Sequence, residues 1–205
     1  VYAALAPSFA GQFEGTVGQL VTALRQMGFY DVMEVALGAD LTAQTEAAEF
    51  EERGGNMLSS CCPAFVEFVE KNLPAQAELL SKTPSPMVMT GRYIKERDPH
   101  AKVVFIGPCV AKKMEYQLGK TQGAIDCVVT FEELYAMMAG KGIELTELEE
   151  TPLDEASGYG RAFAASGGVA AAVAQALRER NSKIEAHGLA CAGVEECRAA
   201  ILKMS

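Results

Sequence analysis

The chain has 205 residues, of which 49% are hydrophobic and 22% are charged, so it is long enough to bury a sizeable core and has the composition of a globular protein. Its formal net charge of −9, without any basic patch, argues against a nucleic-acid partner. No apolar run approaches the roughly 20 residues of a membrane span, and the N-terminus lacks the basic and long apolar regions of a signal peptide.

Six cysteines are spread along the chain, at positions 61, 62, 109, 127, 191 and 197. No pair has the CxxC spacing of a zinc finger. Because no secretory signal is visible, a disulfide framework is not expected. We expect reduced thiols in a cytoplasmic protein, some of them ligands or catalytic groups. Because the chain begins at Val1 rather than at Met, we expect it to be a domain excised from a longer protein.

Apolar spacing and turn residues predict that strands and helices alternate along the chain. The expected strands lie at 2–9 (running into a loop), 29–37, 103–106, 125–130 and 184–190. The expected helices lie at 15–27, 41–53 (capped by Asp40 or Thr42), 63–73, 87–96, 131–140, 169–180 and 194–204. This alternation implies an α/β fold with mostly parallel sheets flanked by helices, in two lobes with the active-site cleft between them. A lobe boundary is expected near 144–157, in a Glu-rich loop.

Cys61 and Cys62 are adjacent and directly precede Pro63, at the predicted start of a helix. A vicinal pair closes only a strained disulfide, so the two thiols are expected to have separate roles. Proline suits the first helical turn, and the positive end of a helix dipole favours thiolate over thiol. These features indicate a metal ligand or an acid–base thiol. From this segment alone, a buried and inert pair in a turn has about equal weight.

Cys109 follows a short apolar strand, at the carboxyl end where open α/β sheets bind ligands. Three thiols that meet at such strand ends can hold an iron–sulfur cluster, because thiolates are its usual ligands. Lys112 and Lys113 come one helical turn later. Basic residues at a helix N-terminus oppose the helix dipole, so their position indicates a nearby anion. A solvated helix start is the alternative.

The segment Ser-Ser-Cys-Cys-Pro-Ala-Phe at 59–65 resembles the first cysteine motif of the iron-only ([FeFe]) hydrogenases, Thr-Ser-Cys-Cys-Pro-x-Trp. The segment Gly-Pro-Cys-Val-Ala-Lys-Lys-Met-Glu at 107–115 resembles the second, Met-Pro-Cys-x-x-Lys-Lys-x-Glu. Three shorter segments match flanking motifs of the family in the same order: Ala-Pro-Ser at 6–8, Ala-Asp-Leu-Thr at 39–42 and Ser-Gly-Gly-Val at 166–169. The resemblance implies that residues 1–205 are a partial C-terminal catalytic domain of the large subunit.

In that family the catalytic H-cluster joins a 4Fe–4S cluster to a two-iron unit, so the resemblance implies this cofactor in the parent protein. By position, Cys62 and Cys109 would ligate the 4Fe–4S part. Cys61 would pass protons to the two-iron unit, and Lys112 would hydrogen-bond one of its cyanide ligands. The residues that would line the two-iron pocket are Ala6, Pro7 and Ser8.

The resemblance also implies a proton path from Cys61 through Glu46 and Ser81 to Glu49. Glu46 and Glu49 are three residues apart on a predicted helix and therefore share a face. Two carboxyls with tuned pKa values suit proton transfer. Without the resemblance, a solvated pair of glutamates on an Ala-rich helix is the favoured interpretation.

The family's third cysteine motif, Met-Ala-Cys-x-x-Gly-Cys-x-Gly-Gly, supplies the other two cluster ligands and has no match. It is expected to follow the last predicted helix, beyond the end of the chain. Cys191 and Cys197 have the wrong spacing to replace it and are interpreted as structural, as is Cys127 in a predicted buried strand. Gly107 and Phe65 replace the family's Met and Trp, which is typical of divergent, sensor-type members.

The resemblance implies that the parent protein reversibly reduces protons to H₂ in the cytoplasm of an anaerobe. Its electron partner would be a ferredoxin-type carrier or an upstream iron–sulfur domain, and neither nucleic acid nor a membrane is expected as a partner. The chain itself, with two of four cluster ligands, is expected to hold no cluster or an incomplete one. An H₂ or redox sensor is the first alternative and an iron–sulfur assembly factor the second. A dinucleotide-binding enzyme is less favoured, because the glycines at 158–168 do not form GxGxxG after a strand.

Overall fold

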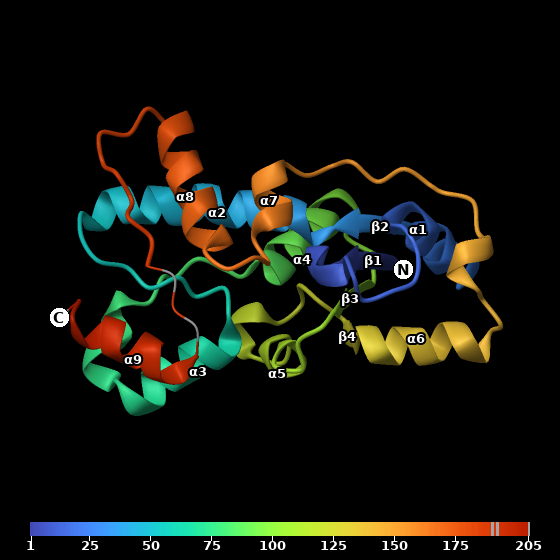
Figure 1. The fold of residues 1–205 in the computed structure, drawn as a ribbon, viewed down its shortest axis with the longest axis horizontal. Helices are drawn as coiled ribbons and strands as arrows, with labels where there is room; N and C mark the ends of the chain where they lie inside the picture. The colour runs from blue at the N-terminus through green and yellow to red at the C-terminus, as the bar shows by residue number, and fades with distance from the viewer. Residues whose placement is uncertain (190, 192, 205) are drawn as a thin grey trace.

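The computed structural model describes residues 1–189, 191 and 193–204. Its centre is a four-stranded parallel sheet with the strand order β2-β1-β3-β4 (Figure 1). The strands are β1 (Tyr2–Leu5), β2 (Asp31–Glu34), β3 (Val103–Gly107) and β4 (Cys127–Thr130). The middle strands β1 and β3 are apolar throughout apart from Tyr2, as expected for parallel strands covered on both faces.

Helices connect the strands and cover the sheet. They are α1 (Val17–Gln26), α2 (Val35–Arg53), α3 (Pro63–Asn72), α4 (Pro86–Arg97), α5 (Lys112–Glu115), α6 (Phe131–Gly140), α7 (Gly158–Ala162), α8 (Gly168–Glu179) and α9 (Val194–Leu202), with short 3₁₀ turns η1 (Pro7–Phe9), η2 (Pro74–Leu79), η3 (Gly119–Thr121) and η4 (Leu145–Glu147). Thr16 and Thr130 begin α1 and α6 with reciprocal capping boxes. Pro63 and Pro86 occupy the first turns of α3 and α4, where a missing N–H costs nothing.

Buried apolar side chains form three clusters in the described residues. The largest surrounds the sheet and includes Leu5. The second joins α2, α7 and α8 through side chains such as Ala43 and Leu177, and the third joins α3 and α9 through Val69 and Ile201. Figure 1 shows α2 extending from the sheet towards these helical clusters. The α/β class is confirmed, with one sheet in the described residues, whereas the two-lobed arrangement and its boundary stay predictions.

The start of α2 differs from the expectation. The range 29–37 was expected to be a strand, but β2 is shorter and the helix already begins at Val35. Asp40 and Thr42, expected as helix caps, therefore lie inside α2. Asp40 instead accepts hydrogen bonds from the backbone N–H and the hydroxyl of Ser157, at 2.9 and 2.5 Å, and so ties the segment before α7 to α2.

Gly38 allows α2 and α4 to pack backbone against backbone. A Cβ atom at this position would lie 2.2 Å from Thr90 Oγ1 and 2.3 Å from Pro86 O, so no side chain fits. Thr42 Oγ1 donates a hydrogen bond to Pro84 O at 3.2 Å in the same contact. This contact fixes the position of the following turns of α2, which carry the two glutamates of interest.

Two further expectations were wrong. The described part of the expected strand at 184–190 forms no strand, and residue 190 lies outside the described residues. Cys127 is exposed rather than part of the core, because it is the first residue of the edge strand β4 and its side chain does not face the cluster around the sheet.

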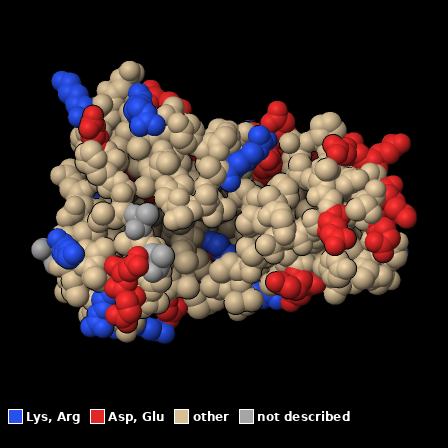
Figure 2. Space-filling model, in the orientation of Figure 1, with Lys and Arg blue, Asp and Glu red and all other residues tan. Residues whose placement is uncertain are grey.

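The surface carries more carboxylates than basic groups. In the view of Figure 2, acidic side chains gather at the end of the molecule that carries α1, α6 and η4. This distribution agrees with the net charge and offers no basic face to a nucleic acid in that view. In the described part of the chain, no helix is long and apolar enough to span a membrane.

Candidate functional site

The carboxyl ends of β1 and β3 lie side by side and carry two of the expected segments. The Ala6 N–H donates a hydrogen bond to a β3 carbonyl at 2.8 Å, and a Cβ atom on Gly107 would lie 3.0 Å from Ala6 Cβ. Pro7 and Ser8 continue from β1 as the turn η1, and Cys109 follows β3. The expected pocket residues therefore lie at the sheet edge that also carries a candidate cluster ligand.

Lys112 connects this sheet edge to the vicinal cysteines. Its backbone N–H donates to Cys109 O at 3.2 Å, and its ammonium group donates to Cys61 O at 3.0 Å. The ammonium also pairs with Glu115 at 2.5 Å, and the two side chains are only 12% and 8% exposed. Cys62 occupies the N-cap position of α3. Lys112 therefore connects the segments that carry the first and second cysteine motifs, although these segments are far apart in the sequence.

The thiols of Cys62 and Cys109 have the chemistry of two of the four ligands that an iron–sulfur cluster usually has. Cys62 is exposed and Cys109 is half-buried, and both thiols are free. Thiolates are the usual ligands of such clusters, and the ammonium of Lys112 can compensate for their negative charge. Among the described residues, no group of three or more His, Cys, Asp or Glu side chains could hold a metal ion.

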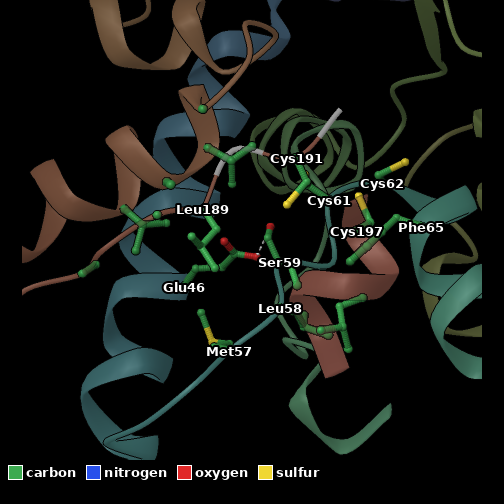
Figure 3. A pocket seen from close by; sticks show the side chains of 18 of the residues that line it. Glu46, Met57, Leu58, Ser59, Cys61, Cys62, Phe65, Leu189, Cys191 and Cys197 are labelled. Atoms are coloured by element: carbon green, nitrogen blue, oxygen red, sulfur yellow. Dashed lines mark hydrogen bonds between the residues drawn. The ribbon is translucent and has the colours of Figure 1, made fainter. Parts of the chain in front are cut away.

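A pocket of about 410 Å³ lies beside the vicinal cysteines (Figure 3). Its walls come from α2, α8, α9 and the segments around 57–65 and 186–189, and most of them are apolar. Four cysteines line it: Cys61, Cys62, Cys191 and Cys197. The spacing of the last two in the sequence did not predict that they share a cavity with the first two.

The Cys61 thiol is protonated at neutral pH. Burial raises the pKa of Cys61 to about 11, although a side-chain hydrogen bond with Ser59 and the charge of Lys112 favour the thiolate. The expectation that the helix dipole would favour a thiolate is therefore wrong for Cys61, because desolvation outweighs it. A neutral thiol at the pocket wall is suited to donating or accepting a proton.

Glu46 is a buried carboxyl at the pocket wall, only 1% exposed. Ser59 Oγ donates a hydrogen bond to Glu46 Oε1 at 2.8 Å, and the Ser60 N–H approaches the same oxygen at 3.4 Å. Glu46 Oε2 has no hydrogen-bond partner among the described residues. Burial raises the pKa of Glu46, and the hydrogen bonds from Ser59 and Ser60 only partly oppose this effect. The carboxyl consequently keeps its proton to a higher pH than an exposed glutamate does.

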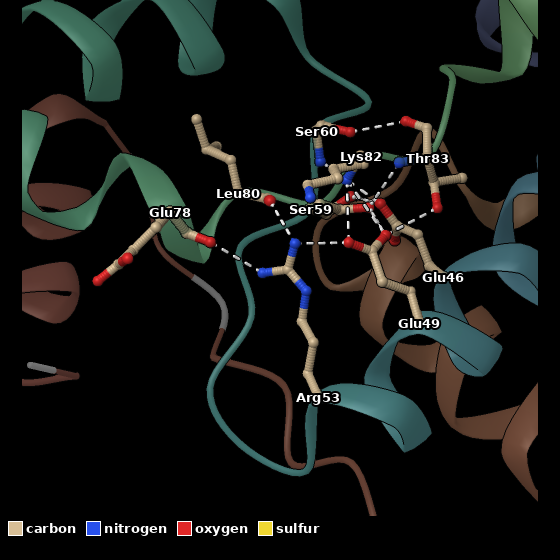
Figure 4. Close-up of polar contacts among 10 residues, drawn as sticks. Glu46, Glu49, Arg53, Ser59, Ser60, Glu78, Leu80, Lys82 and Thr83 are labelled. Carbon is tan, nitrogen blue, oxygen red and sulfur yellow. Dashed lines mark hydrogen bonds and ion pairs between the residues drawn. The ribbon is translucent and has the colours of Figure 1, made fainter.

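Glu49 lies one turn further along α2, in a very different environment (Figure 4). Its carboxylate accepts hydrogen bonds from Ser81 Oγ at 2.6 Å, Thr83 Oγ1 at 3.0 Å and the Lys82 N–H at 3.0 Å. Arg53 forms an ion pair with it at 2.6 Å. Partial burial raises the pKa of Glu49, but these hydrogen bonds and Arg53 outweigh it and lower the pKa.

The residues expected to form a proton path are thus brought together. Ser59 lies between the Cys61 thiol and the Glu46 carboxyl, and Ser81 acts on both glutamates. The resulting series is Cys61, Ser59, Glu46, Ser81 and Glu49. Sequence reasoning missed Ser59 and Arg53. The i,i+4 spacing of Glu49 and Arg53 is a signal that could have identified the second.

The family model described as "Iron only hydrogenase large subunit, C-terminal domain" matches residues 1–204. The chain belongs to this family. It is 32% identical to iron hydrogenase 1 of Clostridium pasteurianum over 191 residues, which cover 82% of this chain and 33% of that protein. It is also 34% identical to the cytosolic Fe–S cluster assembly factor NAR1 of Kluyveromyces lactis over 93 residues, which cover 45% of this chain and 20% of that protein.

Solved structures of the family share the fold. The [FeFe]-hydrogenase HydA(deltaEFG), whose structure reveals stepwise H-cluster assembly, superposes with a TM-score of 0.74 at 28% identity, over 94% of this chain and 56% of that one. A variant of the [FeFe]-hydrogenase HydA1 from Chlamydomonas reinhardtii gives 0.72 at 27% identity, with the same coverage. The chain therefore spans about one third of the C. pasteurianum hydrogenase and just over half of the solved chains.

Two positions that depart from the hydrogenase motifs are accommodated by their surroundings. At Gly107, a Cβ atom would lie 2.8 Å from the Phe105 ring, so the ring occupies space that a longer side chain would need. Phe65 lies on the first turn of α3 and lines the pocket next to the vicinal cysteines. The observed packing of the sheet edge therefore suits glycine at position 107, and Phe65 forms part of the pocket wall.

Proposed function

We propose that this chain is the part of an iron-only hydrogenase that provides two cluster ligands and the inner proton path, and that the whole protein interconverts protons, electrons and H₂. The observation that carries this proposal is the arrangement of Cys61, Ser59, Glu46, Ser81 and Glu49, in which Ser59 donates a hydrogen bond to Glu46 and Ser81 donates one to Glu49. A neutral buried thiol and two carboxyls with opposite pKa shifts are what an internal proton path needs. Membership of the family supports the proposal.

In this proposal Cys62 and Cys109 hold the 4Fe–4S part of the H-cluster, and the turn at 6–8 lines the pocket of the two-iron unit. The bound cluster supplies the redox chemistry. Lys112 compensates for its negative charge, and the ion pair with Glu115 keeps the ammonium group in position. We propose that the other two cysteine ligands come from a further segment of the parent protein, as in the third motif of the family.

The protein's own residues move the proton. The Cys61 thiol and the Ser59 hydroxyl are in contact, and Ser59 donates to Glu46, so a proton passes along this line by reorientation of a single hydroxyl. A protonated Glu46 turns its otherwise unpartnered Oε2 into a donor. Ser81 donates its own proton to Glu49 and accepts a hydrogen bond from the Thr83 N–H at 3.0 Å, which leaves one lone pair of its hydroxyl oxygen to accept a proton. Glu49, which resides in an open hollow with Lys82 and Arg53, exchanges the proton with solvent.

Two other functions would use the same fold. An iron–sulfur assembly factor is supported by the partial match to NAR1, and a sensor by the replacements at Gly107 and Phe65. Neither function requires a proton path from the pocket to the surface, and the presence of all the expected path residues from Cys61 to Glu49 in one region therefore favours the hydrogenase.

We propose a ferredoxin-type carrier or a further iron–sulfur domain as the electron partner, in a cytoplasmic protein. The distribution of thiols supports this partner. Four cysteines line the pocket, Cys109 lies beside Lys112, and Cys127 is exposed at the sheet edge, so no second set remains for a relay cluster.

The test is H₂ evolution by the matured full-length protein with reduced methyl viologen, compared between the wild type and Cys61→Ala. We expect the variant to bind as much iron as the wild type and to lose turnover by orders of magnitude, because it cannot carry the proton. Undiminished turnover in Cys61→Ala would refute the path. A wild-type protein that binds iron fully but turns over no H₂ would instead support the sensor or the assembly factor.

A further inference from the structure

Thr83 is a buried residue beside the proposed proton path, and its hydroxyl, N–H and carbonyl groups are all hydrogen-bonded there. The hydroxyl donates a hydrogen bond to Glu49 Oε2 at 3.0 Å, and the N–H donates one to Ser81 Oγ at 3.0 Å (Figure 4). The carbonyl oxygen accepts a hydrogen bond from Ser60 Oγ at 2.8 Å. Thr83 therefore contacts two members of the path, although the path itself does not pass through it.

The main chain holds Thr83 in place through a pair of parallel segments, 58–60 and 79–83. Their first contact is an isolated parallel bridge between Leu58 and Leu80, with backbone hydrogen bonds of 2.7 and 2.8 Å. The second contact is the hydrogen bond that the Thr83 carbonyl accepts. Each segment carries one serine of the path, so the two contacts fix the position of both hydroxyls against α2.

The hydroxyls of Thr83 and Ser81 converge on one oxygen of Glu49. Ser81 Oγ donates to Oε2 at 2.6 Å, whereas Arg53 pairs with Oε1 at 2.6 Å. The carboxylate is thus held from both sides, with Oε2 towards Ser81. A hydroxyl that donates to a carboxylate favours the charged form. Partial burial raises the pKa of Glu49, but hydrogen bonds that include those from Ser81 and Thr83 outweigh it and lower the pKa.

The N–H of Thr83 also restricts how the Ser81 hydroxyl can be used. A hydroxyl oxygen has one proton to donate and two lone pairs. The proton of Ser81 is directed to Glu49, and the Thr83 N–H occupies one of the lone pairs. The other lone pair remains for a proton that enters the path.

We propose that Thr83 is a positioning residue of the proton path, whose hydroxyl holds Glu49 Oε2 against Ser81 and favours the carboxylate form of Glu49. The role in the path rests on the proposed function, whereas the effect on Glu49 does not. The other charged groups around Glu49 are Arg53, Lys82 and Glu52 at the same hollow and Glu46 one turn away on α2. A substitution at position 83 retains all four.

The first test is the titration of the Glu49 carboxyl in the full-length protein before maturation. Carbon-13 NMR of protein labelled at the glutamate carboxyls follows it, and Glu49→Gln assigns the resonance. We expect Thr83→Val and Thr83→Ala to shift the titration to higher pH, because both remove the donor. Thr83→Ser keeps the hydroxyl and should titrate like the wild type. The alanine variant separates loss of the hydroxyl from any desolvation by the added methyl group of valine.

Thr22→Val is the matched control. Thr22 lies on α1, outside the path, and its hydroxyl donates to the carbonyl oxygen of Glu149 at 2.7 Å. Its loss should leave the Glu49 titration unchanged. Identical Glu49 titrations in Thr83→Val and Thr83→Ser, or an equal shift in Thr22→Val, would overturn the proposal.

The second test is the pH profile of H₂ evolution by the matured protein with reduced methyl viologen. The limb that reports Glu49 should move to higher pH in Thr83→Val and Thr83→Ala, as the titration does, and return in Thr83→Ser. A shifted titration with an unchanged profile would refute the role of Thr83 in the path. If the matured wild type evolves no H₂, the proposed function fails, and the titration still decides whether Thr83 acts on Glu49.

Discussion

Glu46 and Glu49 lie one helical turn apart on α2, and their surroundings shift their pKa values in opposite directions. Burial raises the pKa of Glu46. At Glu49, partial burial is outweighed by hydrogen bonds, the one from Ser81 foremost, and by Arg53, so its pKa falls. The resting proton is therefore held at the pocket end of the pair, and the negative charge lies at the solvent end.

Glu46→Gln removes the proton-carrying group but keeps the shape of the side chain. In the matured full-length protein we expect H₂ evolution to fall by about 10²–10⁴, the usual contribution of a positioned acid or base. Glu52→Gln is the matched control, because Glu52 is exposed on the same helix. Equal activity in the two variants, measured with reduced methyl viologen, would rule out a role for Glu46 in proton transfer.

Ser59→Ala removes the hydroxyl that contacts both the Cys61 thiol and Glu46. We expect a loss of about 1 kcal/mol in the free energy of unfolding, because the buried Glu46 loses a donor, and a fall in turnover of the matured protein. Ser59→Thr keeps the hydroxyl and should restore both quantities. If the alanine and threonine variants behave alike in denaturation and in H₂ evolution, the hydroxyl has no such role.

Gly38→Ala tests the close contact between α2 and α4. The added methyl group would lie 2.2 Å from Thr90 Oγ1, and we expect this overpacking to cost about 1–3 kcal/mol of unfolding free energy. Gly140→Ala is the control, since a Cβ atom there meets nothing within 4 Å. It should leave the protein unchanged or stabilise it by up to about 1 kcal/mol through better helix propensity. Similar denaturation midpoints for both variants would contradict the packing.

The elements that sequence predicted well are those whose signals are local. The range 131–140 was expected as a helix and is observed as α6, because a threonine cap and a glutamate three residues later begin it. The range 29–37 was mispredicted because its apolar residues suit a buried strand and a buried helix equally. The close packing of Gly38 on α4 favours a helix from Val35 onward. A local sequence pattern does not reveal this packing, because it depends on a distant segment of the chain.

The sequence predicted only those residues of the candidate site that belong to recognisable family motifs. The family resemblance identified Cys61, Ser81 and the two glutamates, and the structure adds that Ser59 donates a hydrogen bond to Glu46 and Ser81 donates one to Glu49. Sequence reasoning also missed that Cys191 and Cys197 line the same pocket as Cys61 and Cys62, because their spacing matches no recognisable motif. Desolvation of Cys61 also could not be predicted, since it depends on which helices close the pocket.

Asp126 should make stability depend on pH in the acid range. Partial burial raises its pKa, but hydrogen bonds from Lys95, Lys102 and the Val103 N–H outweigh this effect and hold the pKa at about 2, against 3.8 for the free side chain. Because the pKa is lower in the folded state, the stabilisation is complete above the unfolded pKa and is lost as pH falls from about 4 towards 2.

Asp126→Asn should therefore cost about 1–2 kcal/mol at pH 7, a figure reduced for the partial exposure of the pair. The difference from the wild type should shrink as pH falls from about 4 to 2. Urea denaturation at a series of pH values measures this. A difference that is constant across that window would show that the carboxylate charge is not responsible.

The central claim is that Cys62 and Cys109, which Lys112 brings to one side of the molecule, are ligands of the same iron–sulfur cluster. The most direct measurement is the iron and sulfide content, with the thiolate-to-iron absorption band, of the anaerobically reconstituted full-length protein as wild type, Cys62→Ser, Cys109→Ser and Cys127→Ser. Loss of iron and of the band in both Cys62→Ser and Cys109→Ser, with wild-type values in Cys127→Ser, is the predicted result. Full iron content and an unchanged band in either of the first two variants would contradict it.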